Sequence, residues 1–466
     1  MKNDHQQFRP FLSRSRPAVL WHRLRVTARI QAFKLSLRVM ALFFTVSKKM
    51  RAEINNPVTG FVFNARYQFS TRDDLVHLYM IFENGRVRTG RGRIDSPDVT
   101  VFYKDRSTLA DIFDKNPEES LDYLLTNDMS YTGNMAYLTR FSYLTTLLAG
   151  PSSRETRKKS APLAEPDRDI EAGPKARIIE NERLGRRVDK VRFLEDPFLA
   201  RYRIEDFPRL KYLKNRRFNQ RPAVCPERAL LVTRYFRKNG FETDSAGNPI
   251  DPGLRQAGAM RYLMERKKPV IPERNLLAGS TTSKEVGVPV YPEFIGTTIW
   301  PELKTISSRE LNPNDLSRQD ADILNFEVFP FWMDRNVREY CRRVNKAPMS
   351  QQLEERFVLY FMMKNNAISH TIPDFEMVLR RGLNGIMTDA RAREAEALEV
   401  SSRRFYRSLA IVIEGVLAYA ENLAAEAERL ATVAGDSPET SGSRLSELLE
   451  IARICRRVPA YPSETV

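Results

Sequence analysis

The sequence predicts two folded regions of different class, an α/β domain over residues 52–150 and a mostly helical region over residues 178–466. In "VHLYMIF", residues 76–82, apolar side chains alternate with polar ones, which is the period of a β-strand. From residue 218 onward, apolar residues recur every three or four positions, as in amphipathic helices. Residues 151–177 between them are rich in proline, serine and charge, which indicates a linker.

The charge of the chain is unevenly distributed. The net charge is +16, and residues 1–51 alone contain twelve basic residues and one acidic residue. Residues 152–217 contain nineteen basic and twelve acidic residues. The excess therefore belongs to an N-terminal arm and to the linker region, whereas a nucleic-acid-binding domain normally carries its basic face itself. We expect no nucleic-acid partner.

Cysteine and histidine usage argues against a metal site. Cys225, Cys341 and Cys455 lie far apart, so a disulfide framework is not expected and the default location is the reducing cytoplasm. No CxxC or HExxH pair occurs, and no glycine-rich phosphate loop is present. We therefore expect neither a bound metal nor a nucleotide cofactor in this chain.

Residues 18–47 of the arm have the pattern of a basic amphipathic helix. Five basic residues are interspersed in this segment. Its apolar positions are spaced by three or four residues and form one stripe: Val26, Ile30, Phe33, Leu37, Met40 and Phe44. The longest uncharged run is far shorter than the ~20 residues that span a bilayer. Two alternatives follow: the stripe packs on the next domain, or it binds a lipid or membrane surface.

The α/β domain is expected to begin with strands and to continue with helices. After "VHLYMIF" comes the turn "ENGR", and "DVTVFYKD" (98–105) is a second strand-like run. "STLADIF", "PEESLDYLL" and "NMAYLTRFSYLTTLLAG" then have helical patterns, with Ser107 and Pro117 at plausible starts of the first two. The stretch from "LYMIFENGR" through "SPDVTV" to "SYTGNMAYLTRF" resembles the sterol carrier protein type of lipid-binding domain.

That resemblance implies an apolar tunnel for acyl chains or sterols between the sheet and its helices. The inward face of the first strand would line this lipid cavity with Val76, Leu78, Met80 and Phe82. The alternative is that these side chains form an ordinary core and that the domain serves only as an interaction module.

The second region carries a longer resemblance. "RPAVCPERALLVTRYFRKNG", "NLLAGSTTSKEVGVPVYPEFIGTTIWPEL", "LNFEVFPFWMDRNVREYCR", "ISHTIPDFEMVLRRGLNGI" and "RLSELLEIARICRRVPAYPSETV" occur in order. Together they resemble the N-terminal half of a glycyl radical enzyme of the pyruvate formate-lyase superfamily, which includes formate C-acetyltransferase. The resemblance implies an incomplete α/β barrel wrapped in helices, with a buried site that protects a radical from water and oxygen in anaerobic metabolism.

The chemistry that the resemblance implies needs two groups. A cysteine becomes a thiyl radical that takes hydrogen from a small substrate, and a glycine near the C-terminus of the family's chain stores the radical. A radical S-adenosylmethionine activating enzyme installs it. Both motifs lie beyond the point that corresponds to Val466, so we assign no catalytic residue here and expect this chain to be inactive alone.

The resemblance also places several residues near the substrate cavity. His370 precedes a predicted helix that Thr371 would cap, and the segment around residues 291–300 supplies further polar and aromatic side chains. The predicted substrate-binding residues are His370, Thr371, Tyr291, Glu293 and Trp300. For each of them the alternative is a packing role in the core.

Three functional interpretations remain open from the sequence. The chain is the N-terminal half of a glycyl radical enzyme fused to a lipid-carrier-type domain, or a non-catalytic binding protein that carries apolar molecules in residues 58–149. Alternatively, it is one subunit of a split enzyme completed by a second chain. The substrate cannot be named, because cleavage, dehydration and radical addition share this scaffold.

Overall fold

The computed structural model describes most of the chain. The described residues are 16–111, 123, 126–148, 180–181, 186–187, 204–294, 296–309, 312–344, 349, 373–435 and 442–464. The predicted linker and the predicted helix at "PEESLDYLL" lie almost wholly outside these residues.

The chain forms two compact units whose boundaries differ from those expected. Unit 1 comprises residues 1–148, 292–301 and 325–371, and unit 2 comprises the remaining residues, 149–291, 302–324 and 372–466. Two pieces of the region that was expected to fold apart from the N-terminal domain therefore belong to the same unit as that domain. Buried polar contacts join the piece at residues 325–371 to the N-terminal domain, such as those of Asn134 with Met333 and of Arg140 with Asn325.

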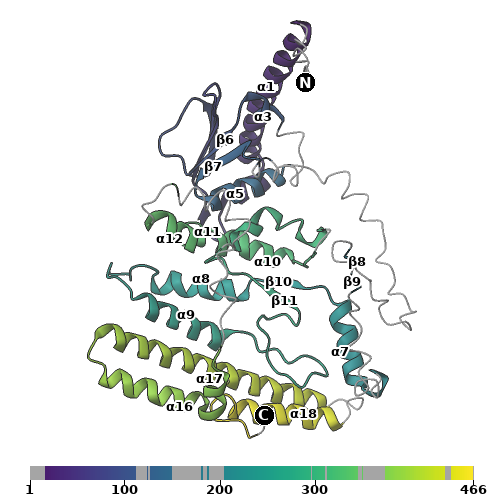
Figure 1. Cartoon of the computed structure of the whole chain (residues 1–466), viewed down its shortest axis with the longest axis vertical. Helices are drawn as coiled ribbons and strands as arrows, with labels where there is room; N and C mark the ends of the chain where they lie inside the picture. The colour runs from purple at the N-terminus through teal and green to yellow at the C-terminus, as the bar shows by residue number, and fades with distance from the viewer. Residues whose placement is uncertain are drawn as a thin grey trace, which may run out of the picture. The chain divides into compact units, whose positions relative to one another are not determined.

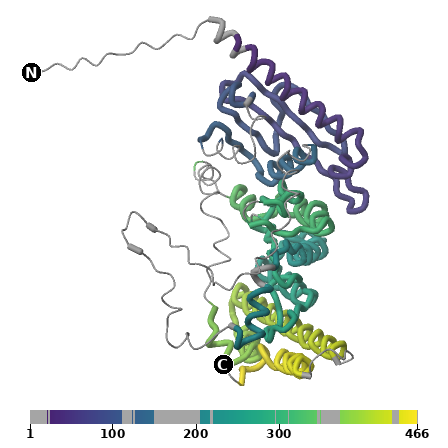
Figure 2. Tube along the Cα trace, turned by 90° about the vertical axis from the view of Figure 1, so that its right-hand side faces the viewer, coloured from purple at the N-terminus to yellow at the C-terminus, as the bar shows by residue number. Residues whose placement is uncertain are grey.

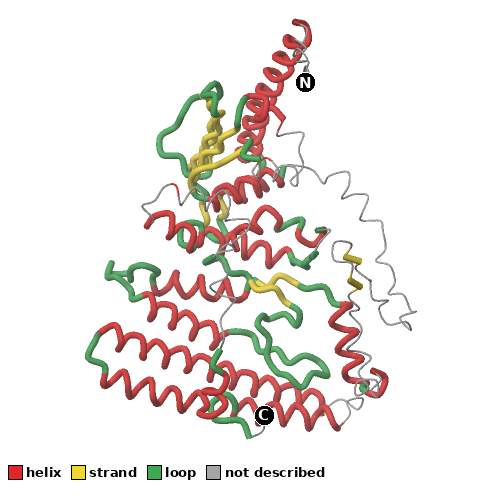
Figure 3. Tube along the Cα trace, viewed as in Figure 1, coloured by secondary structure: helices red, strands yellow, loops and turns green. Residues whose placement is uncertain are grey.

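Unit 1 is built on a five-stranded sheet with the order β5-β4-β3-β6-β7 (Figures 1 and 3). β3 and β6 are parallel, and the other neighbouring pairs are antiparallel. The strands are β3 (Ala65–Thr71), β4 (His77–Glu83), β5 (Arg86–Arg91), β6 (Val99–Tyr103) and β7 (Met129–Gly133). β1 (Asn55–Asn56) and β2 (Phe61–Val62) form a separate short hairpin.

The turn between β4 and β5 is the predicted one. Glu83 pairs with Arg86, which leaves the two-residue loop Asn84-Gly85. Both loop residues have positive φ, 51° and 73°, as a type I′ turn requires. Asparagine and glycine tolerate this conformation best, so the predicted turn is confirmed.

Helices cover one face of this sheet. The long helix α1 (Arg16–Val46) lies beside the sheet (Figure 2), and Phe33 and Phe44 on it contact Phe69 and Phe82 with ring centroids 5.7 and 6.0 Å apart. Of the predicted stripe on α1, five residues are buried, so the packing alternative is confirmed for them: Ile30, Phe33, Leu37, Met40 and Phe44.

Three more helices complete this part of unit 1. α2 (Lys48–Ile54) follows α1, and α3 (Arg106–Asp111) packs against α1. α5 (Met135–Thr146), where a helix was predicted, is capped by Asn134, and the ring centroids of Phe141 on it and Tyr67 of β3 lie 4.8 Å apart. The start of α3 differs from the prediction, because Asp105 rather than Ser107 accepts the first-turn amide, that of Thr108.

Unit 2 is mostly helical, as predicted. Its only parallel strand pair among the described residues is β10 (Ala223–Cys225) with β11 (Gly287–Pro289). The helices are α7 (Pro208–Asn219), α8 (Glu227–Asn239), α9 (Pro252–Arg266), α10 (Arg318–Ile323), α16 (Phe375–Glu396), α17 (Val400–Gly435) and α18 (Gly442–Arg457).

α17 is the central helix of unit 2 and packs against α9, α16 and α18 (Figure 1). It approaches α9 closely, because a Cβ added at Gly415 would lie 2.7 Å from the Cα atom of Arg261. By length and hydropathy, α17 is the one described helix that would suffice to cross a membrane, and α1 with α2 reaches that level only as a pair bent by 96°. A central helix of a helical bundle has the same composition, and the packing of α17 is of that kind.

Candidate functional site

Trp300, a predicted substrate-binding residue, lies in the core of unit 1. Its side chain is fully buried in η5 (Gly296–Glu302), and its indole N–H donates to Oδ1 of Asn325 at 2.8 Å. Its ring contacts Phe329 of α11 (Phe329–Trp332) with centroids 5.1 Å apart. These are the surroundings of a packing residue, and a substrate contact of Trp300 stays a prediction.

Next to Trp300 lies Arg140, the most deeply buried cation of unit 1. This α5 residue is fully buried, and its guanidinium donates to Oδ1 of Asn325 and to the backbone carbonyl of Glu53. Burial lowers the pKa of Arg140 to about 10, and the Glu53 carboxylate opposes that shift. The side chain therefore remains a cation at neutral pH.

An aromatic and amide cage surrounds this cation. The rings of Phe61, Phe63 and Trp300 lie 5.6, 5.5 and 4.9 Å from the guanidinium carbon. Asn325 belongs to η7 (Leu324–Val328), a single turn of π-helix, and its amide donates to Oε2 of Glu53 at 2.9 Å. One amide thus links the cation, the indole and the carboxylate, so the cluster is a polar joint between three distant segments.

A second joint connects the sheet to α11 and α12 (Val337–Val344). The side chain of Asn134, the cap of α5, donates to the carbonyl of Met333 and to Oδ1 of Asp334, both at 2.9 Å. Arg338 on α12 donates to the hydroxyl of Tyr131 on β7. The polar groups of the sheet's last strand and helix are therefore satisfied by the segment that follows η7.

Acidic groups gather at this second joint. Burial raises the pKa of the Glu339 carboxyl, and Arg342, which donates to its Oε2 at 2.8 Å, opposes that shift. Burial likewise raises the pKa of Asp98, whose Oδ2 accepts the backbone N–H of Arg66 at 2.7 Å. Perturbed acids mark candidate sites, and here they also mark the contact between two sequence-distant segments.

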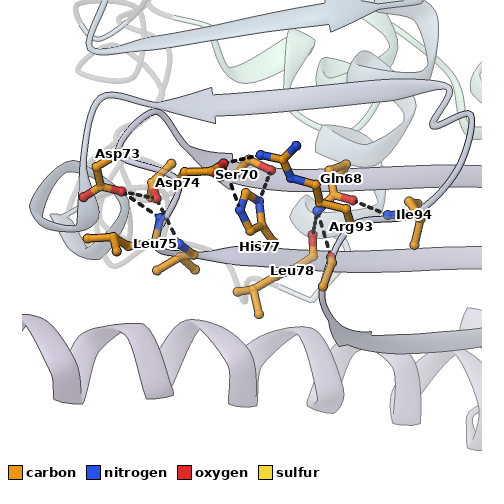
Figure 4. Close-up of polar contacts among 12 residues, drawn as sticks. Gln68, Ser70, Asp73, Asp74, Leu75, His77, Leu78, Arg93 and Ile94 are labelled. Atoms are coloured by element: carbon orange, nitrogen blue, oxygen red, sulfur yellow. Dashed lines mark hydrogen bonds and ion pairs between the residues drawn. The ribbon is translucent and has the colours of Figure 1, made fainter.

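The opposite face of the sheet carries a chain of polar contacts around His77 (Figure 4). Its Nδ1 lies 3.0 Å from the hydroxyl of Ser70, and its Nε2 lies 3.1 Å from Oδ1 of Asp74, which also pairs with Arg93. Gln68 extends the chain, since its amide donates to the carbonyls of Leu78 and Gly92 at 2.9 and 3.2 Å.

The serine, histidine and aspartate resemble a hydrolytic triad in residue type only. A nucleophile must reach its substrate, and Ser70 is 5% exposed within β3. Asp74 is shared with Arg93 rather than dedicated to the imidazole. These polar contacts around His77 therefore hold the loop before β4 against the sheet. Sequence reasoning missed it because the Ser70–His77 pairing depends on strand register.

Two of the other predicted substrate-binding residues, Tyr291 and Glu293, lie on either side of a boundary between the units. Tyr291 is half-buried in unit 2, where the Arg228 guanidinium lies 4.2 Å from its ring centroid. Glu293 is half-buried in unit 1, and its carbonyl accepts the backbone N–H of Val337 at 2.7 Å. His370 and Thr371 lie outside the described residues.

The predicted capping of the helix after His370 was wrong. α16 begins at Phe375, and its N-cap is Asp374, whose carboxylate accepts the N–H of Met377 at 3.0 Å. Thr371 lies too far ahead of this first turn to cap it. Aspartate is at least as good a cap as threonine, which is why Asp374 can take this position.

The predicted lipid-lining residues form one buried face. Val76, Leu78, Met80 and Phe82 are all buried, and the face is shared with aromatic rings from β3 and α1. Their alternation is thereby confirmed, while a lipid cavity stays a prediction.

The cysteines of the described residues are free thiols in different settings. Cys225 is buried at the end of β10, directly before α8, with its sulfur 3.1 Å from the hydroxyl of Ser283. Cys341 and Cys455 are half-buried, and burial raises the pKa of Cys455. Within the described ranges, no three His, Cys, Asp or Glu side chains are grouped to hold a metal ion.

Comparison with known proteins identifies the family of the helical region. The family described as pyruvate formate lyase-like matches residues 201–466, more than half of the chain. The chain belongs to the pyruvate formate lyase-like family. The matched family domain therefore includes unit 2 from residue 201 onward and the two pieces of unit 1 at residues 292–301 and 325–371.

Similar proteins include lyases and dehydratases. The isethionate sulfite-lyase of Nitratidesulfovibrio vulgaris is 27% identical over 53% of this chain and 30% of its own length. The trans-4-hydroxy-L-proline dehydratase of Clostridioides difficile is 25% identical over 56% of this chain and 32% of its own length. A solved Roseburia inulinivorans protein of 1,2-propanediol dehydration has 25% identity and a TM-score of 0.47, covering 55% of this chain and 29% of that one.

The chain therefore spans about 30% of the length of the curated relatives that it matches. The sterol carrier resemblance of residues 58–149 received no support from these similarities.

Proposed function

We propose that residues 201–466 supply part of the catalytic scaffold of a glycyl radical lyase or dehydratase that acts on a small substrate. The family match over these residues carries the proposal, and both reaction types occur among the similar proteins. A radical glycine takes hydrogen from a cysteine thiol, and the resulting thiyl radical takes hydrogen from a substrate carbon. Polypeptide other than these residues would supply that cysteine and glycine.

The residues of this chain would then shape and shield the site. Tyr291 and Glu293, with His370 and Thr371, are the candidates for substrate contact, and Trp300 would support them from the core. Cys225 is buried at the end of β10 with its sulfur 3.1 Å from the Ser283 hydroxyl, and we assign it a structural role. Free cysteines suit a reducing compartment such as the cytoplasm.

The test is electron paramagnetic resonance after anaerobic activation. The chain is incubated with a radical S-adenosylmethionine activating enzyme, alone and together with the polypeptide encoded directly downstream of it. We expect no radical from the chain alone, and a glycyl doublet with turnover when a complementary polypeptide supplies the cysteine and glycine. A doublet from this chain alone, with oxygen-dependent cleavage of its backbone, would contradict the proposal that another polypeptide supplies the radical glycine.

A second candidate function is binding of an acyl chain or sterol by residues 58–149. The observation that favours it is the continuous apolar face of β3 and β4 beneath α1 and α5. Such a face can open around an elongated apolar ligand. It can equally be a filled core, so a binding measurement decides.

Displacement of a fluorescent fatty acid from the full chain tests this candidate. Saturable binding should be lost in Leu78→Trp, which fills the inner face, and retained in Tyr79→Trp, which changes the neighbouring residue on the outer face. Thermal unfolding of both variants controls for folding. Absence of saturable binding by the unaltered chain would leave residues 58–149 as a packing module only.

A further inference from the structure

α1 carries a second apolar row on the side that does not pack on the sheet. Leu35, Leu42 and Val46 are 59%, 60% and 70% exposed, and Val39 lies between them. Their spacing of four, three and four residues places them on one side of the helix. Leu24, three turns before Leu35, extends the row, and Phe43 flanks it.

This row is distinct from the stripe that the sequence pattern singles out. That stripe is used internally, since Phe33 and Phe44 contact the sheet. The exposed row consists of large side chains in succession rather than scattered ones. A row of large apolar side chains on an otherwise polar surface indicates an interaction site.

The charges around the row restrict what covers it. α1 contains no acidic residue, and Arg25 and Arg38 are exposed beside the row. Lys48 and Lys49 follow at the start of α2, also exposed. Burial and the neighbouring cations Arg91 and Arg38 lower the pKa of Lys34, so positive charge is crowded along this side.

An occupant must therefore be apolar and negatively charged. A second copy of the chain would bring its own exposed arginines against these, and like charges repel across such a seam. An anionic membrane offers acyl chains to the leucines and phosphate or carboxylate groups to the cations. Trp21, 73% exposed at the near end of the row, is the residue type that favours the interface between headgroups and acyl chains.

We propose that α1 docks this protein on an anionic lipid surface, with the helix lying in the plane of the interface and the row of Leu24, Leu35, Val39, Leu42 and Val46 facing the acyl chains. The sheet then lies on the side of the helix away from the lipid. The docking would hold the family domain close to a membrane.

The tryptophans of the chain make the test direct. Of its three tryptophans, Trp300 and Trp332 are fully or almost fully buried, so a change in emission on addition of vesicles reports Trp21. With vesicles of equal parts phosphatidylcholine and phosphatidylserine, we expect a blue shift and co-sedimentation of the full chain, both weakened by salt. Trp21→Phe should abolish the shift and retain co-sedimentation.

The decisive variants change the row and its charges. Leu35→Gln with Leu42→Gln should weaken partitioning at least about tenfold, whereas Val58→Gln, an exposed apolar residue outside α1, should leave it unchanged. Arg25→Gln with Arg38→Gln should reduce binding to the anionic vesicles.

Three outcomes would overturn the proposal. The first is equal binding to vesicles of phosphatidylcholine alone, and the second is full binding by the double leucine variant. The third is a dimer, seen by sedimentation velocity without vesicles, that the leucine changes dissociate; it would assign the row to a second copy.

Discussion

The two units differ in the side chains that join their segments in the core. In unit 1, Arg140 and Asn325 are buried among aromatic rings and hydrogen-bonded to Glu53. In unit 2, ion pairs of Arg456 with Glu421 and Glu428 lie at the exposed edge of the contact between α17 and α18. The buried part of this contact consists of small and aliphatic side chains: Ala424, Ala427, Ile451 and Ala452. One core is held by directional polar contacts, and the other by close apposition of helices.

The difference follows from how each unit is assembled. Unit 1 joins segments almost two hundred residues apart, such as Arg140 and Asn325, and a hydrogen bond fixes the position of both partners. In unit 2, α17 and α18 are neighbours in the chain with few residues between them, so their buried contact needs no polar group to align it. Polar joints specify a unique arrangement, and small residues permit a close one.

The strongest way to break this comparison is Arg140→Met. The change leaves Glu53 and Asn325 without their cation inside the core, and loss of one partner from a buried charged network costs about 3–5 kcal/mol. We expect segment-resolved hydrogen exchange to show lost protection in β3 and α11, with α17 and α18 unaffected.

A matched surface change controls for charge. Arg88 pairs with Glu83 at 3.5 Å on the exposed side of the β4–β5 hairpin. Arg88→Met should therefore change stability by less than about 1 kcal/mol. Equal effects of the two substitutions would show that the buried joint does not hold unit 1 together.

A smaller effect is expected from overpacking the apolar core with Ala427→Leu. Ala427 is fully buried between α17 and α18, and added methylene groups in a packed core cost about 1–3 kcal/mol. Loss of protection should be confined to unit 2. Ala425→Leu, an exposed position of the same helix, is the control and should be neutral. Tolerance at Ala427 would mean that this contact is looser than its burial indicates.

The smallest effect is a pH dependence at the second joint of unit 1. Because the folded-state pKa of Glu339 is raised, its favourable contribution is present below the ordinary glutamate value of about 4.3 and is lost as pH rises through the raised pKa. Arg342, Arg338 and Asp334 are the charged groups around it. The wild type should therefore lose stability relative to Glu339→Gln as pH increases from 4 to 8 in chemical unfolding. A flat difference would contradict the assigned burial.

Local patterns were sufficient for much of the fold. The turn at Asn84-Gly85 was predicted because it depends on the conformational preference of residues adjacent in the chain. The alternation that ends at Phe82 and the stripe through Phe44 likewise follow from periodicity. The family could also be recognised from the sequence, because several segments that resemble it follow one another in the family's order.

The tertiary structure alone decided what the periodic faces contact. α1 has apolar residues on two sides, and only packing shows that Phe33 faces the sheet while Leu35 faces solvent. Arg140 looks like a surface cation in "YLTRF", because no local signal announces Asn325 as its partner. By itself, the sequence determined the elements and the family, through interactions between near neighbours. The division into units was decided by contacts between distant residues, whose energies depend on burial that no local pattern encodes.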